Sequence, residues 1–273
     1  MIRADTQTPW QPIWAEAAVD GVLAEAGFSV ATYGTSRWLA KDPAGERLIL
    51  GRGGTGNASE TAIIEALTPQ ATCRYASLDL RLSEKPSRVA EAQTLLAKAW
   101  MLIDRVPSLA QTIAVLVRSI HILDAPSPGF DVSHSDPDLP CSIFLSLPID
   151  ESFAALRAAE SIVHEAMHLQ LTLFEAEAPL VEQDCAVTGF SPWQQRDRPL
   201  LGLVHGLFVF VAIDRFMALL IDAGLQPQEV TFALKRRREI AAEIAEIAGL
   251  EASVGLTVAG RILVGRLLGC SPA

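Results

Sequence analysis

Two histidines and a glutamate stand at a spacing that can bind a metal ion. His164 and His168 are four residues apart, and Glu165 directly follows the first histidine. Residues four apart on an α-helix lie on one face, so both imidazoles can point at one divalent ion. In zinc hydrolases, a glutamate in this position accepts a proton from the attacking water. The spacing therefore predicts a metal site with Glu165 as the candidate catalytic residue.

A third metal ligand has to come from elsewhere in the chain, because the motif supplies only two. Leu171 occupies the position at which the longer metzincin pattern has glycine, so that arrangement is excluded. The favoured third ligand is His205, which lies between Gly202 and Gly206. These glycines cost helix stability and would let another group approach the helix closely. The alternatives are two carboxylates that follow the motif, Glu182 and Asp184.

The residues around the motif predict a long helix that follows two strands. Asp150 fits the N-cap of this helix and Glu151 its first turn, and an Ala- and Leu-rich pattern continues to about Glu177, before Pro179. Strands are expected at 119–124 and 141–147, on either side of a loop rich in Pro, Ser, Asp and Gly. These elements would place the two histidines in a cleft.

The rest of the chain predicts an α+β fold that is predominantly helical, with a small β-sheet next to the HExxH helix. Further helices are expected at about 15–26, 87–103, 199–223, 235–250 and 258–268, with strand-like pieces at 28–33 and 47–50. The length fits one domain over 1–273, with a mixed α/β region over about 1–115 and the metal-site region over about 116–268. The run 51–56 fits G-x-G-x-x-G, but no alternating strands and helices follow, so a flexible loop is expected there.

Charge and composition exclude several classes of partner. The formal net charge is -10, and the basic run 235–238 is followed closely by glutamates, which argues against a nucleic-acid partner. The start of the chain does not fit a secretory signal, and the longest apolar stretch, 200–213, is shorter than the roughly 20 residues that cross a bilayer. Four scattered cysteines without a C-x-x-C pair suit a reducing compartment. We therefore expect a cytoplasmic protein with no membrane partner.

Three stretches of the chain resemble a known family. The runs 161–168, 191–199 and 202–206 resemble the HExxH-motif family of Fe(II)- and 2-oxoglutarate-dependent peptide β-hydroxylases, which is associated with ribosomal peptide natural product biosynthesis. The resemblance covers about residues 115–268. It implies a dioxygenase that hydroxylates a side chain of a peptide, such as a ribosomal precursor peptide, at Cβ. It also implies that His205 is the third ligand of Fe(II).

Two arginines before the predicted His205 helix are candidates for binding 2-oxoglutarate. The guanidinium of arginine is the usual partner of a carboxylate such as the distal one of this cosubstrate. Arg196 and Arg198 lie on the loop expected before that helix, and Arg198, directly before Pro199, is the favoured residue. Arg215 and Arg261 are possible substitutes.

Two other functions compete with the oxygenase. A zinc metallopeptidase would use Zn(II) and Glu165 as the general base, with a peptide along the strand at 141–147. A binding module without catalysis would only hold a peptide in the cleft.

Overall fold

The computed structural model describes residues 9–25, 48–50, 62–64, 69–83, 86–125, 127, 130–136, 141–149 and 151–269. This part of the chain has the predicted α+β fold, mostly helix with small sheets. It divides into two compact units, Trp10–Leu169, and Gln170–Ala273 together with Met1–Pro9. Because the division falls inside one continuous helix, the single domain expected over 1–273 stays a prediction. The segments predicted at 28–33 and 51–56 lie outside the described residues.

The unit Trp10–Leu169 contains a five-stranded sheet with the strand order β1-β2-β3-β5-β4. The strands are β1 (Leu48–Leu50), β2 (Ala62–Ile64), β3 (Ser119–Leu123), β4 (Ser133–Ser135) and β5 (Ser142–Ser146). β3 pairs in parallel with β2 and β5, whereas β4 pairs antiparallel with β5. β5 therefore has a partner strand on both edges. β4 lies inside the segment that was predicted to be only a loop.

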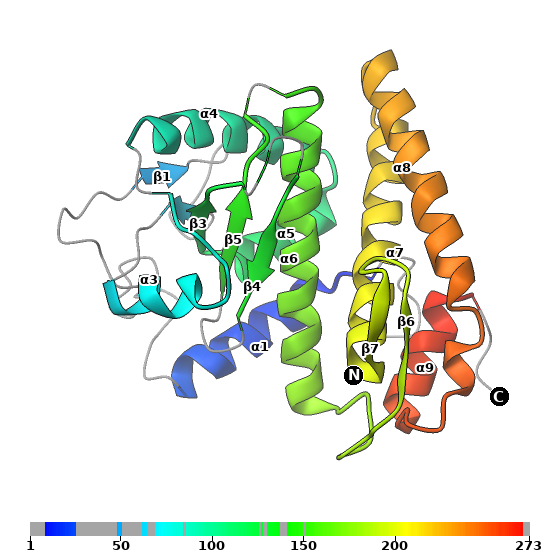
Figure 1. The fold of residues 1–273 in the computed structure, drawn as a ribbon. Helices are drawn as coiled ribbons and strands as arrows, with labels where there is room; N and C mark the ends of the chain where they lie inside the picture. The colour runs from blue at the N-terminus through cyan, green and yellow to red at the C-terminus, as the bar shows by residue number, and fades with distance from the viewer. Residues whose placement is uncertain are drawn as a thin grey trace. The chain divides into compact units, whose positions relative to one another are not determined.

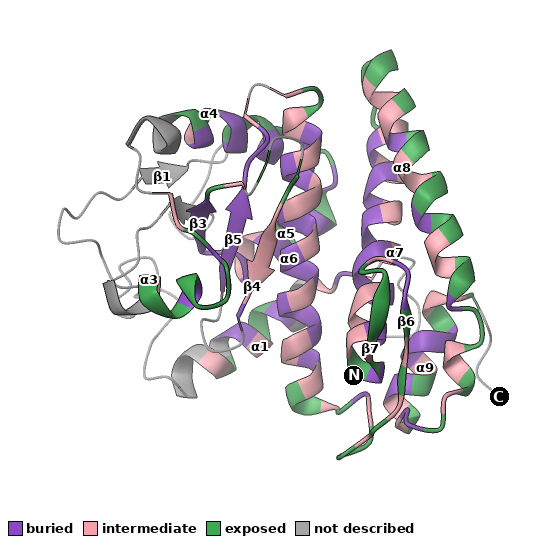
Figure 2. Ribbon diagram, viewed as in Figure 1, coloured by how far each residue is buried: buried purple, intermediate pink, exposed green. Residues whose placement is uncertain are grey.

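Five described helices belong to this unit, four before β3 in the chain and one after β5 (Figure 1). They are α1 (Pro12–Glu25), α3 (Pro69–Ala76), α4 (Pro86–Ile103), α5 (Pro107–Leu116) and the first part of α6 (Ala154–Glu177). The helices predicted at 15–26 and 87–103 are confirmed as α1 and α4, while α3 and α5 were not foreseen. β3 and β5 are internal strands and are buried along their whole length (Figure 2), including polar residues such as His121 and Ser146.

The HExxH helix begins later than the sequence predicted. α6 starts at Ala154, and Phe153 before it has a φ of 57°, in the left-handed region where a helix cannot continue. Glu151 therefore precedes the helix instead of occupying its first turn, and the expected N-cap, Asp150, lies outside the described residues. The end of the helix at Glu177, before Pro179, is confirmed.

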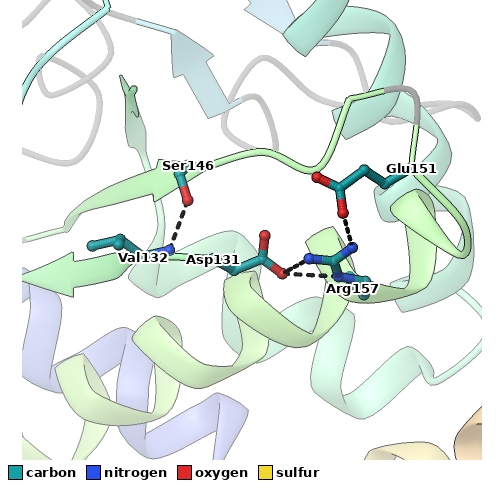
Figure 3. Close-up of polar contacts among 5 residues, drawn as sticks. All are labelled: Asp131, Val132, Ser146, Glu151 and Arg157. Carbon is teal, nitrogen blue, oxygen red and sulfur yellow. Dashed lines mark hydrogen bonds and ion pairs between the residues drawn. The ribbon is translucent and has the colours of Figure 1, made fainter. Parts of the chain in front are cut away.

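Arg157 fixes the start of α6 to two neighbouring segments (Figure 3). Its guanidinium donates to Asp131 Oδ2 at 2.9 Å from Nε and to Glu151 Oε2 at 2.6 Å. The backbone N–H of Val132 donates to Ser146 Oγ at 2.7 Å. The forked guanidinium thus connects the segment before β4 to the beginning of the helix, while Val132 connects the same segment to the end of β5.

The burial of the Asp131 carboxyl gives a pH dependence of stability. Burial raises the pKa of Asp131 above the ordinary value of 3.8, and the Arg157 charge offsets this effect only in part. The folded state therefore holds the proton more tightly than the unfolded state, so this group loses stability as the pH rises from 3.8 through the raised pKa. We expect wild type to lose free energy of unfolding relative to Asp131→Asn over that interval. Urea denaturation of both proteins from about pH 3.5 to 6.5 measures this, and a constant difference would contradict it.

The unit Gln170–Ala273 is helical, with one β-hairpin of β6 (Thr188–Ser191) and β7 (Arg196–Pro199). Its helices are α7 (Leu200–Asp222), α8 (Pro227–Glu246), η2 (Leu250–Ala252) and α9 (Val258–Leu267). α7 packs against α8 and α9, and Figure 1 shows α7 and α8 side by side. The helices predicted at 199–223 and 258–268 are confirmed, whereas α8 begins earlier than predicted.

The basic run on α8 is engaged with acidic side chains. Arg237 binds Asp214 of α7 through two nitrogens, at 2.8 and 3.3 Å. Lys235 and Arg236 each lie 3.6 Å from a carboxylate oxygen of Glu239. The basic run is therefore paired with acidic side chains, as is usual on a solvent-exposed helix face.

α7 is longer than the apolar stretch seen in the sequence. It continues past Ile213 to Asp222, and its 23 residues are long and apolar enough to cross a membrane by length and composition. The sequence argument that this stretch is too short is therefore wrong. However, 56% of its most apolar window is buried inside the protein, and the core helix of a soluble protein passes the same test.

Candidate metal site

The two motif histidines meet on α6. Their Nε2 atoms are 3.2 Å apart, with the ring centroids 4.8 Å apart and the ring planes at 63°. Two nitrogens that bind one ion at about 2.1 Å lie about 3.0 to 3.4 Å from each other, for angles between octahedral and tetrahedral. A hydrogen bond between the rings has a similar length. The spacing of the pair therefore fits a shared metal ion and a direct hydrogen bond equally well.

Glu165 is a buried carboxylate beside this pair. It is only 2% exposed, and its Oε1 lies 3.8 Å from His164 Nε2. It makes no hydrogen bond to any residue that the structure describes. A buried carboxylate is costly without a close partner, so its place next to the histidine pair suits a group that moves a proton or faces a cation.

His205 forms a pair with a glutamate that the sequence analysis missed. Its Nε2 lies 2.8 Å from Glu175 Oε2, and the two side chains are 17% and 19% exposed. At about 100° per residue, Glu175 lies within roughly 20° of both His164 and His168 around the axis of α6. The helical period of α6 could therefore have identified Glu175 from the sequence. A carboxylate commonly orients the ring of a ligating histidine, and a His–Glu pair also stabilises a fold without a metal.

The complete set of metal ligands stays a prediction. Among the residues that the structure describes, no group of three or more His, Cys, Asp or Glu side chains is placed to hold a metal ion. The structure brings His164 together with His168, and His205 together with Glu175. The alternative third ligands, Glu182 and Asp184, are exposed and lie after the end of α6.

Arg198 packs directly on the helix that carries His205. Both candidate arginines lie on β7 and not on a loop, because β7 pairs with β6. A Cβ atom on Gly202 would lie 3.0 Å from Nε and 3.1 Å from Cζ of Arg198, so the glycine allows the guanidinium to lie against α7. Within the described part of the chain, this guanidinium has no hydrogen bond or ion pair. A guanidinium that lies against Gly202, about one helical turn before His205, and has no partner among the described residues is suited to an anion.

The other candidate arginines are placed differently. Arg196 is exposed and donates to Gln194 Oε1 at 3.0 Å. Arg261 donates to the backbone carbonyls of Glu251 and Leu256, which is a structural role. Arg215 has a buried Nε without a hydrogen-bond partner among the described residues. Arg198 remains the best placed.

Trp193 uses the space left by the second glycine. A Cβ atom on Gly206 would lie 2.5 Å from two ring carbons of Trp193. The Trp193 ring stacks on Phe210 at a centroid distance of 4.9 Å and an angle of 11°, and Arg236 lies over the Phe210 ring. Both glycines beside His205 thus let another group approach the helix, as the sequence predicts. Trp193 was not among the predicted site residues, although Gly206 pointed to such a contact.

Comparison of the chain with models of protein families gives no match, and comparison with curated proteins gives none. The interpretation of the site therefore depends on the residues of the chain.

The two glycines of α7 should respond oppositely to alanine. Gly206→Ala places a methyl group in the ring of Trp193, which is held by Phe210, so we expect a loss of about 1–3 kcal/mol in the free energy of unfolding. Gly202→Ala meets only the movable end of Arg198, so its helix propensity should leave stability unchanged or raise it by up to about 1 kcal/mol. Urea denaturation measures both values, and equal effects would show that the packing of Trp193 is not rigid.

Proposed function

We propose that the protein is an Fe(II)- and 2-oxoglutarate-dependent oxygenase that hydroxylates a peptide side chain at Cβ. The observation that carries this proposal is the Arg198 guanidinium, which lies against the helix of His205 and has no partner among the described residues, because a dicarboxylate cosubstrate needs such a group. The resemblance to the HExxH-motif peptide β-hydroxylases supports the same reaction. The substrate would be a peptide, such as a ribosomal precursor peptide, in the cytoplasm.

Each residue of the site has a distinct role in this proposal. His164 and His168 hold Fe(II) together with His205, whose ring Glu175 orients through the 2.8 Å contact. Three neutral histidines leave the metal charge uncompensated, which favours a dianionic cosubstrate. Bound iron with 2-oxoglutarate and O2 supplies the oxidising power for hydroxylation. Arg198 binds the distal carboxylate and so fixes the orientation of the cosubstrate.

The decisive measurement is succinate formation from 2-oxoglutarate after anaerobic reconstitution with Fe(II). We expect O2-dependent succinate from wild type and none from His205→Ala. Arg198→Met should raise the KM for 2-oxoglutarate about tenfold or more, because a charge-assisted contact is lost. Arg196→Met is the matched control on the same strand and should keep the wild-type KM. Absence of succinate with candidate peptides present, from protein that retains zinc, would overturn the proposal.

A zinc metallopeptidase is the second candidate, and the position of Glu165 favours it. The buried carboxylate lies 3.8 Å from His164, where it could act as a general base toward a water molecule. Under this alternative, Glu165→Gln should lower peptide hydrolysis by about 10²- to 10⁴-fold, whereas Arg198→Met should leave it near the wild-type rate. Peptide cleavage assays of the Zn(II) form, with both variants, distinguish this function from the oxygenase.

A further inference from the structure

A cavity of about 390 Å³ lies at the carboxyl end of β3, within the unit Trp10–Leu169. It falls in the range of roughly 300–1,000 Å³ that is typical of small-ligand pockets. Four of its lining residues are aliphatic and three are charged. The aliphatic residues are Leu80, Leu123, Ala125 and Val132, and the charged residues are Asp79, Arg81 and Asp124.

The backbone around this cavity is fixed by pairing between β3 and the segment after α3. Leu82 forms an antiparallel bridge with Leu123, and the N–H of Asp124 donates to the carbonyl of Arg81 at 2.8 Å. This register places Arg81 and Asp124 opposite each other across the pair. Asp79 turns the chain after α3 with a φ of 61°. The charged residues therefore project from a backbone that is held in place.

The aliphatic wall of the cavity belongs to a packed cluster. Leu80 and Leu123 are buried with Tyr75 and Phe144, and Val132 packs against them. The rings of Tyr75 and Phe144 are 4.4 Å apart at their centroids. This wall is therefore supported from behind, which is typical of a preformed pocket.

The charged side chains of the cavity do not neutralise one another. Within the part of the chain that the structure describes, none of Asp79, Arg81 and Asp124 forms a side-chain hydrogen bond or an ion pair, although Arg81 and Asp124 are cross-strand neighbours. Opposite charges that remain separate around one cavity complement a ligand that carries both signs. The carboxylates suit an ammonium group, the guanidinium suits a carboxylate, and the leucines suit an alkyl chain.

We propose that this cavity binds an aliphatic zwitterion, either a free amino acid or a short peptide with its two charged ends. This ligand uses all three kinds of lining group at once, whereas a simple cation or anion would leave one sign of charge unpaired. The binding site is independent of the HExxH motif and of the proposed metal chemistry.

Calorimetric titration of the full chain tests this proposal with four probes. L-Leucine carries both charges, L-leucinamide lacks the carboxylate, and 4-methylpentanoate lacks the ammonium group. L-Alanyl-L-leucine represents the short peptide. We expect L-leucine or the dipeptide to bind about tenfold or more tightly than either single-charge analogue, because each analogue loses a charge-assisted contact. Tighter binding of the dipeptide identifies a peptide ligand, and tighter binding of leucine identifies a free amino acid.

Variants assign the binding to this cavity. Arg81→Met should remove the preference for the zwitterion over leucinamide, and Asp124→Asn should reduce its preference over 4-methylpentanoate. Both residues are exposed, so the fold should survive, and equal melting temperatures verify this. Arg266→Met, an exposed arginine on α9, is the control and should bind as wild type does. The proposal is overturned if neither zwitterion binds at about 10 mM, well above a typical millimolar Kd, or if Arg81→Met binds all probes as wild type does.

Discussion

The candidate metal site depends on α6 keeping one helical register from Ala154 to Glu177. A one-residue bulge between His164 and His168 would rotate one side chain by about 100° relative to the other, which would separate the two imidazoles. The register is fixed at its beginning, where Arg157 binds carboxylates on two segments outside the helix. By the helical period, Glu175 falls within roughly 20° of the two histidines around the helix axis, so the sequence of α6 alone relates the partner of His205 to the histidine pair.

Two glycines make α7 intrinsically less stable and leave room for side chains of other segments. Two glycines in the interior of an apolar helix cost about 1 kcal/mol each relative to alanine. Both positions are used, because Arg198 lies over Gly202 and Trp193 lies over Gly206. Trp193 is in turn held by Phe210. The hairpin of β6 and β7 therefore contacts α7 at both glycines, and only the contact of Trp193 at Gly206 strictly requires glycine. The contact at Gly202 places the Arg198 guanidinium about one helical turn before His205.

Local sequence patterns predicted the long helices, whereas the short strands and some helix boundaries depend on long-range contacts. α4, α7, α9 and the end of α6 were predictable because apolar periodicity and Pro179 are local signals. The start of α6 was not, because it depends on the positive φ of Phe153 and on Arg157 binding outside the helix. β4, β6 and β7 were missed because strands of three or four residues have little local sequence pattern and are stabilised by pairing with other strands. The histidine pair was predictable from spacing alone, whereas the partner of His205 required the fold.

Glu165 is buried at a cost that a bound cation would reduce. This position lies in a stretch of α6 dominated by alanine and aliphatic residues, where alanine would fill the site without any desolvation cost. Instead, the chain buries a carboxylate whose Oε1 lies 3.8 Å from the imidazole of His164. A sequence that breaks its local pattern at one buried position usually does so for function. A cation held by His164 and His168 would offset the desolvation of Glu165, so one bound ion would account for both the unfavourable burial and the histidine spacing.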